Sequence, residues 1–78
     1  MGNKAYIITN EVQERYILNK LEEDGFTWWT GDNLIDNMPS KLLDINFQYV
    51  IFVDDNKVSW DMLSELTNEE VVYDGREE

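Results

Sequence analysis

The stretch FQYVIFVDDNKVSW, residues 47–60, decides the fold of this chain. Its first part is almost entirely apolar and rich in β-branched and aromatic side chains, which predicts a buried strand over residues 47–53. Asp55 and Asn56 follow, and both residue types tolerate the left-handed backbone of a tight turn. The run KVSW predicts a second strand, so residues 47–60 indicate an antiparallel hairpin.

A further strand and the main helix are predicted upstream of this hairpin. Residues 4–9, KAYIIT, are rich in β-forming side chains and predict a strand. Asn10 is a residue type that caps helix N-termini, and Gln13 stands at the spacing of a capping box. We therefore predict a helix over residues 11–24.

The apolar side of that helix and its end are also located by the sequence. Ile17, Leu18 and Leu21 fall within one arc of the helix and are expected to face the core. Gly25 suits the left-handed position that ends many helices. Phe26 then has the position from which a side chain folds back onto Leu21.

The segments on either side of the hairpin give less regular patterns. Residues 26–30, FTWWT, predict a strand that ends at a Gly-Asp-Asn turn. Residues 31–46 are less clear; within them, residues 38–44 fit either a short helix with Pro39 in its first turn or an ordered loop. Ser59 is expected to cap a short helix over residues 60–66.

The end of the chain completes the predicted fold. Residues 70–74, EVVYD, form either a last short strand or an ordered tail, and residues 75–78, GREE, are expected to fray. Together the segments predict an α+β fold in a single domain, residues 1–78. We expect a mostly antiparallel sheet of about three to five strands, with one main helix and one or two short helices on one face.

Acidity is the strongest feature of the composition. Seventeen Asp and Glu residues against six Lys and Arg give a formal net charge of −11. Nucleic acids and anionic membranes are negatively charged, so neither is an expected direct partner. A basic protein surface is the natural complement, although acidity also serves solubility alone. Since the chain has no cysteine and no long apolar run, we expect a cytoplasmic protein without a membrane span.

The residue inventory argues against catalysis. Neither histidine nor cysteine occurs, which excludes the common nucleophile–base pairs and most transition-metal sites. The four glycines are scattered and form no phosphate-binding loop. The run Asp54-Asp55-Asn56 has the composition of a calcium loop but lacks EF-hand spacing, so we interpret it as the hairpin turn. We expect no enzymatic activity, no cofactor and no bound metal.

The stretch EEDGFTWWTGD, residues 22–32, is the candidate binding surface. Glu22, Glu23 and Asp24 occupy the last turn of the predicted helix, where the helix dipole opposes each negative charge by about 0.3–1 kcal/mol. A sequence chosen for stability alone would place Lys or Arg there. Acids that break this local rule indicate a functional site.

The adjacent tryptophans extend this surface. In a strand, Trp28 and Trp29 point to opposite faces, so one of them lies in the core. We expect residues 33–46 to cover the other; if it is exposed instead, it is a binding anchor. The candidate partner-binding residues are Glu22, Glu23, Asp24, Trp29, Asp32, Asp36, Asp54 and Asp55. Further carboxylates with which the chain would imitate the charge of DNA are Asp61, Glu65, Glu69 and Glu70.

Residues 21–31, LEEDGFTWWTG, resemble a pattern in short phage- and prophage-encoded proteins. In that pattern a helix ends in Leu-x-x-x-Gly, and an aromatic residue, a tryptophan and a glycine turn follow. The size and acidity of the chain are also similar to those of phage-encoded inhibitors of host defence, including anti-CRISPR and anti-restriction proteins. Several such inhibitors imitate the charge of DNA, which implies a basic nucleic-acid enzyme as partner. The resemblance implies no catalytic residue.

Two functions stay open. The first is an acidic inhibitor or decoy that occupies a basic, nucleic-acid-binding surface of a host protein in the host cytoplasm, as a monomer or homodimer. The second is a small accessory or regulatory module that binds a protein or small ligand through an aromatic patch. A partner that salt releases favours the first function, and a salt-insensitive partner favours the second.

Overall fold

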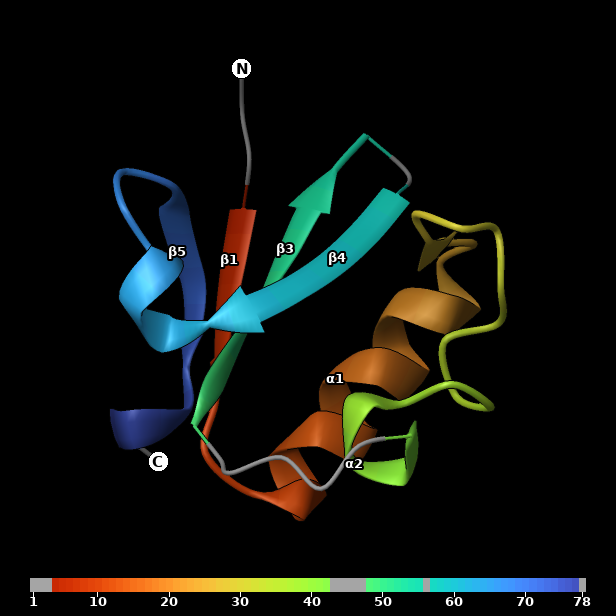
Figure 1. Cartoon of the computed structure of the whole chain (residues 1–78), viewed down its shortest axis with the longest axis horizontal. Helices are drawn as coiled ribbons and strands as arrows, with labels where there is room; N and C mark the ends of the chain where they lie inside the picture. The colour runs from red at the N-terminus through yellow and green to blue at the C-terminus, as the bar shows by residue number, and fades with distance from the viewer. Residues whose placement is uncertain (1–3, 43–47, 56, 78) are drawn as a thin grey trace.

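The computed structural model describes residues 4–42, 48–55 and 57–77 (Figure 1). The strands are β1 (Lys4–Ile8), β2 (Thr27–Trp28), β3 (Tyr49–Asp54), β4 (Lys57–Met62) and β5 (Glu70–Asp74). The helices are α1 (Glu11–Glu23) and α2 (Pro39–Leu42), and two 3-10 turns follow them, η1 (Leu63–Glu65) and η2 (Gly75–Glu77).

The five strands form one mixed sheet in the order β2-β4-β3-β1-β5. The three central strands pair antiparallel, whereas β2 and β5 at the two edges pair parallel with their neighbours. The predicted α+β fold in a single domain is therefore confirmed. Each edge strand is distant in the sequence from its partner, which leaves room for the long crossover connection that parallel pairing requires.

Strands β3 and β4 form the predicted hairpin. Their register pairs Asp54 with Lys57 and Tyr49 with Met62. Asp55 has the left-handed φ, 55°, that a turn residue of this kind needs. The predicted start of the first strand at residue 47 lies outside the described residues, and so does residue 56 of the turn.

The N-terminus of α1 is capped much as predicted. Asn10 Oδ1 accepts a hydrogen bond from Gln13 N at 2.9 Å. The Gln13 side chain differs from a standard capping box because its Oε1 accepts from Thr9 N, at 2.8 Å, one residue before the cap. This end of the helix is therefore tied to the end of β1.

The C-terminus of α1 is a complete Schellman cap, with the helix ending at Glu23. Gly25 has a φ of 95°. Phe26 N donates to Leu21 O at 3.1 Å, and Gly25 N donates to Glu22 O at 3.0 Å. Phe26 packs against the core, as its position after the glycine predicted.

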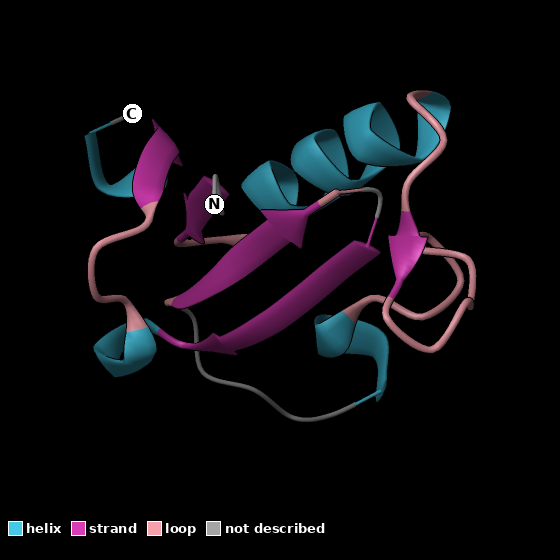
Figure 2. Cartoon of the chain, turned by 90° about the horizontal axis from the view of Figure 1, so that it is seen from above, coloured by secondary structure: helices cyan, strands magenta, loops and turns pink. Residues whose placement is uncertain are grey.

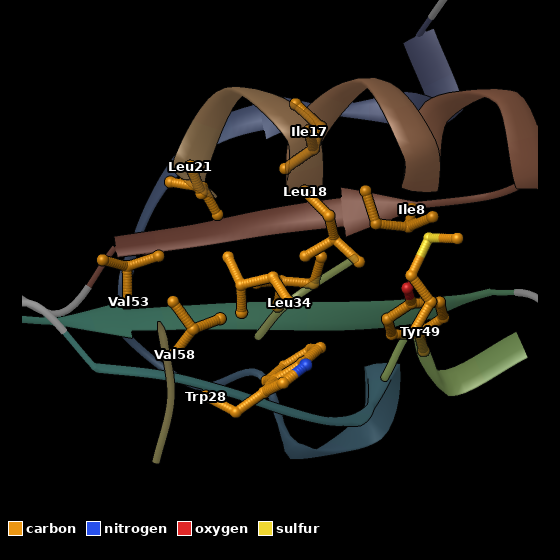
Figure 3. Close-up of a cluster of buried hydrophobic side chains, with 11 residues drawn as sticks. Ile8, Ile17, Leu18, Leu21, Trp28, Leu34, Tyr49, Val53 and Val58 are labelled. Atoms are coloured by element: carbon orange, nitrogen blue, oxygen red, sulfur yellow. The ribbon is translucent and has the colours of Figure 1, made fainter. Parts of the chain in front are cut away.

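The main core lies between α1 and one face of the sheet. Figure 2 shows α1 along one side of the β3–β4 hairpin. Figure 3 shows Leu34 between the buried side chains of α1 and Trp28, so a loop residue fills the centre of the cluster. The buried members are Ile8, Ile17, Leu18, Leu21, Trp28, Leu34, Met38, Tyr49, Ile51, Val53 and Val58.

The opposite face of the sheet carries a smaller cluster. Ala5, Ile7 and Val50 are fully buried there, and Leu63 and Leu66 pack against them. The prediction placed the helices on one face, but η1 and the residue after it lie over the other. Side chains alternate along a strand, so central strands that are apolar on both faces need cover on both.

The predicted helix over residues 60–66 is wrong. β4 continues to Met62, and only Leu63–Glu65 form a 3-10 turn. Ser59, the expected helix cap, lies within β4 opposite Phe52. Pairing with β3 decides the outcome, because an extended ladder satisfies the backbone of a segment too short to form a stable helix alone.

The end of the chain packs against the fold at Gly75, where the sequence predicted that fraying begins. Residues 70–74 adopt the strand alternative and form β5. Gly75 is buried, and its carbonyl oxygen accepts from Gln13 Nε2 at 3.0 Å. A Cβ at Gly75 would lie 2.1 Å from Gln13 Oε1 and 2.7 Å from the backbone oxygen of Ile7, which cannot move away, so a glycine is needed for this close approach. Residue 78 lies outside the described part of the chain.

The segment between α1 and β3 differs from the prediction in extent. Strand β2 covers only Thr27–Trp28 of the predicted 26–30. The short-helix alternative holds for Pro39–Leu42, whereas residues 43–46 are not described.

Among the helices that the structure describes, none has the length and apolar character that a membrane span requires.

Candidate functional site

Trp28 and Trp29 have different environments, as the alternation of a strand predicts. Trp28 is 3% exposed and belongs to the main core, whereas Trp29 is 57% exposed. Their rings are nearly perpendicular, with centroids 6.1 Å apart and an interplanar angle of 81°. The expectation that residues 33–46 cover the second tryptophan is wrong, because Leu34 and Met38 of that segment pack in the core with Trp28 instead.

A tight turn after β2 fixes the position of Trp29. Trp29 N donates to a carbonyl oxygen of β4 at 2.9 Å. Gly31, with a φ of 91°, donates from its N to Trp28 O at 2.8 Å. Thr30 Oγ1 donates to Asp32 Oδ2 at 2.9 Å, so the Asp32 carboxylate is held beside the same turn.

All three tryptophans of the chain line one open pocket of about 230 Å³. Trp60 reaches it from β4 and packs edge-on against Tyr49, with ring centroids 5.5 Å apart. The lining residues are Trp28, Trp29, Thr30, Asp32, Asn37 and Trp60. The pocket therefore combines three indole rings with a carboxylate, a hydroxyl and an amide.

A buried carboxyl group supports the Trp60 side of the pocket. Glu14 of α1 is fully buried. Its Oε2 accepts from Tyr49 OH at 2.8 Å and from Ser40 N at 3.2 Å, and its Oε1 accepts from Ser40 Oγ. Burial, together with the neighbouring Glu14 carboxyl, raises the pKa of Tyr49 above its ordinary value of 10.0. Because Tyr49 packs on Trp60, Glu14 links α1 and α2 to the pocket wall.

Neither the burial of Glu14 nor the pocket was predicted from the sequence, although signals for each exist. Glu14 precedes Ile17, Leu18 and Leu21 by three, four and seven positions, so it lies on the apolar stripe of α1. A carboxyl group on such a stripe is the signal of a buried acid. Trp60 was assigned to a helix, and that assignment hid its place on β4 beside the other two tryptophans.

The structure brings the predicted acids to one edge of the sheet. Thr27 of β2 pairs with Lys57, and Lys57 pairs with Asp54 across the hairpin. The hairpin turn therefore lies beside β2 and the end of α1, as Figures 1 and 2 both show. We call this region the β2 edge; it consists of residues 22–37 together with Asp54, Asp55 and Lys57.

The predicted residues differ in their roles at the β2 edge. Glu22 is half-buried, and its Oε1 accepts from Ile35 N at 3.0 Å, so this carboxylate holds the loop after β2 in place. Asp32 and Trp29 line the pocket. The residues with exposed side chains are Glu23, Asp24, Trp29, Asp32, Asp36, Asp54 and Asp55.

The further carboxylates named from the sequence are not gathered with this set. Glu65 belongs to η1, and Glu69 and Glu70 stand at the start of β5, on the opposite edge of the sheet. Asp61 lies near the end of β4 that is distant from the hairpin turn. One continuous row of all the predicted acids is therefore not formed.

The β2 edge thus unites exposed acids, an exposed tryptophan and a polar–aromatic pocket. Comparisons with protein-family models, with curated proteins and with solved structures find no match for this chain.

Proposed function

We propose that this protein is an acidic binding module that docks through its β2 edge onto a basic, nucleic-acid-binding surface of a host protein, as an inhibitor or decoy. One observation carries the proposal: exposed carboxylates from three separate segments converge with the exposed Trp29 at the β2 edge. The formal net charge of −11 adds a long-range attraction toward any basic partner.

The charges and the tryptophan contribute to different steps of binding. Carboxylates steer the encounter with a basic surface, and salt weakens this effect. Trp29, at 57% exposure, presents a large apolar surface that a partner would desolvate, so it mainly prolongs the complex. When the chain is docked, its carboxylates would occupy the positions on the partner's basic surface that otherwise contact phosphates. Docking would therefore exclude nucleic acid.

A small accessory or regulatory module that binds a protein or a small ligand through the aromatic pocket is the second candidate function. The pocket lined by the three tryptophans favours it, because concave aromatic sites with a few polar groups are typical of ligand binding. Its size, about 230 Å³, suits a side chain or a small amine rather than a nucleotide. Binding of this kind depends on the pocket and not on the total charge, so it would resist salt.

The test compares two triple variants that remove the same charge from different edges of the sheet. The β2-edge variant carries Asp24→Asn, Asp32→Asn and Asp54→Asn. The control variant neutralises exposed carboxylates of η1, β5 and η2 and carries Glu65→Gln, Glu70→Gln and Glu77→Gln. Each immobilised protein is presented with bacterial lysate at low and at high salt. Retained proteins are then identified. The binding of each retained protein to labelled DNA is measured with and without the purified chain, and any retained nucleases are measured first.

We expect the wild-type protein and the control variant to retain a basic protein whose DNA binding the purified chain blocks. The β2-edge variant should lose both effects, and Trp29→Ala should mainly speed dissociation. Equal retention by the two triple variants, or a retained protein that still binds DNA normally, would contradict docking through this edge. A partner held equally at low and high salt supports the second candidate.

A further inference from the structure

The pocket at the β2 edge has aromatic walls suited to a cation. The face of an indole ring carries negative charge density and attracts a cation within about 6 Å of the ring centre. Trp28 and Trp29 stand at 81° to each other, which places a ring face next to a ring edge at one corner of the pocket. No lining residue is basic, and Asp32 adds a carboxylate.

The polar groups of the lining leave hydrogen-bond acceptors for a ligand. Thr30 Oγ1 donates to Asp32 Oδ2, and Asn37 Nδ2 donates to Asn33 O, each at 2.9 Å. The Thr30 hydroxyl proton and one Nδ2 proton of Asn37 are thus used within the protein, whereas Asp32 Oδ1 and Asn37 Oδ1 accept nothing from the described residues. Trp28 Nε1 is shielded from solvent and has no hydrogen-bond partner among the described residues. A donor-rich cation therefore complements the lining.

We propose that this pocket receives the guanidinium group of an arginine of the partner protein, an inference that rests on the docking function proposed above. A guanidinium is planar and weakly hydrated, so it stacks on indole rings more readily than the compact, strongly hydrated ammonium of lysine. It carries several N–H donors, and the lining offers it the acceptors of Asp32 and Asn37.

An arginine in this pocket would also explain how docking displaces nucleic acid. Arginine is the preferred contact to phosphates and to guanine edges on nucleic-acid-binding surfaces. A guanidinium held between the indole rings and the Asp32 carboxylate is no longer available to a phosphate. The pocket thus blocks one such contact directly, while the surrounding carboxylates repel the rest of the nucleic acid by charge.

The inference is tested with small probes, so that no partner protein is needed. N-acetylarginine methylamide is titrated into the full chain, and the indole N–H signals of the three tryptophans are followed by NMR. The matched control probe is the citrulline analogue, which has the same length and a planar end but no charge. The lysine and trimethyllysine analogues test whether any other cation binds as well.

We expect saturable shifts of the indole signals with the arginine probe, with an affinity about tenfold higher than that of the citrulline probe. Asp32→Asn should weaken arginine binding about threefold, as expected for the loss of one exposed ion pair. Glu77→Gln removes the same charge from the exposed η2 turn, outside the pocket and the β2 edge, and should leave the affinity unchanged. Trp29→Leu should weaken binding by a factor similar to that of Asp32→Asn.

Several outcomes would overturn the inference. Equal binding of the citrulline probe excludes a cation site, and equal or tighter binding of the lysine or trimethyllysine probe excludes the assignment to arginine. The lack of any saturable shift with any probe excludes both the cation site and its assignment to arginine. If the probes fail while the β2-edge triple variant still loses its partner, docking stands and only the arginine pocket falls. If the arginine probe binds but neither triple variant alters partner retention, the pocket stands and docking through this edge falls.

Discussion

At the N-terminal end of α1 the side chains of Gln13 and Glu14 bond to the rest of the protein, whereas at its C-terminal end most polar side chains face solvent. Gln13 contacts both Thr9 and Gly75. Glu14 is buried and joins α2 to β3 through hydrogen bonds. Glu23 and Asp24, in contrast, are exposed and have no hydrogen bond or ion pair from their side chains to the described residues.

The difference separates a stabilising end of the helix from an end available for binding. The backbone is capped at both ends, so the contrast lies in the side chains alone. The interaction of a carboxylate with the helix dipole is stabilising near the N-terminus and destabilising near the C-terminus. Polar groups that gain nothing for the fold, placed beside an exposed tryptophan, are the expected composition of a contact surface.

Removal of the buried carboxyl group should have the largest effect on stability. Glu14→Ala takes away the acceptor that Tyr49 and Ser40 share and leaves a cavity between α1 and α2. We expect the free energy of unfolding to fall by about 3 kcal/mol, measured by urea denaturation. Glu11→Ala, at an exposed position one turn earlier, is the control and should cost less than about 1 kcal/mol. Equal losses for the two variants would contradict a stabilising role for the Glu14 hydrogen bonds.

Alkaline pH should have the second-largest effect, because it titrates Tyr49, the hydrogen-bond donor to the buried Glu14 near the N-terminal end of α1. The pKa of Tyr49 is raised by burial and by Glu14, so the folded protein holds the phenolic proton more tightly than the unfolded chain does. The stability from this group is complete below the ordinary pKa of 10.0 and is lost as pH rises above it, by up to about 1.4 kcal/mol per pH unit. Urea denaturation across this range is the measurement.

Tyrosine variants identify the group responsible for the alkaline loss. Tyr49→Phe cannot titrate, so its stability should fall less steeply above pH 10.0 than that of the wild type. Burial, with the charge of Asp24, also raises the pKa of Tyr6, so Tyr6→Phe should reduce the slope by a smaller amount. If Tyr49→Phe and the wild type lose stability in parallel, Tyr49 is not the group that titrates.

Neutralisation at the C-terminal end should have the smallest effect, and its sign should be opposite. Glu23→Gln with Asp24→Asn removes charges that the helix dipole opposes, so stability should rise by about 0.3–1 kcal/mol for each at low salt. Glu11→Gln, at the other end of the same helix, should lower it and also breaks the 3.9 Å ion pair with Arg15. Urea denaturation at low salt measures both changes, and added salt should shrink both. A loss of stability at the C-terminal end would show that these acids are structural.

Several elements of the fold were predictable because their signals are local. Asn10 and Gly25 mark the two ends of α1 by the backbone conformations that they favour. The apolar run of β3 and the turn at Asp55 define a hairpin from neighbouring residues alone. The same local rule of alternation separated Trp28 from Trp29. In each case the energy that decides the structure comes from residues close in sequence.

Other elements were not predictable because their partners are far away along the chain. Residues 60–66 have helix-like spacing, yet pairing with β3 extends β4 to Met62. Gly75 appeared to belong to a loose tail, yet it packs against Gln13, 62 residues earlier. Leu34 lies in a segment without clear periodicity and still fills the centre of the core. Such long-range packing overrides local propensity.

The sequence by itself determined the acidity, the main helix with its caps, the hairpin and the opposite orientations of the two adjacent tryptophans. Only the tertiary structure decided that Trp60 joins them, because the parallel pairing of Thr27 and Trp28 with Lys57 and Val58 places β4 alongside β2. It also decided that Trp29 is exposed, since Leu34 and Met38 are buried in the core with Trp28. Composition and local pattern fix which groups a chain carries, but strand register fixes which of them meet, and register depends on the packing of the whole sheet.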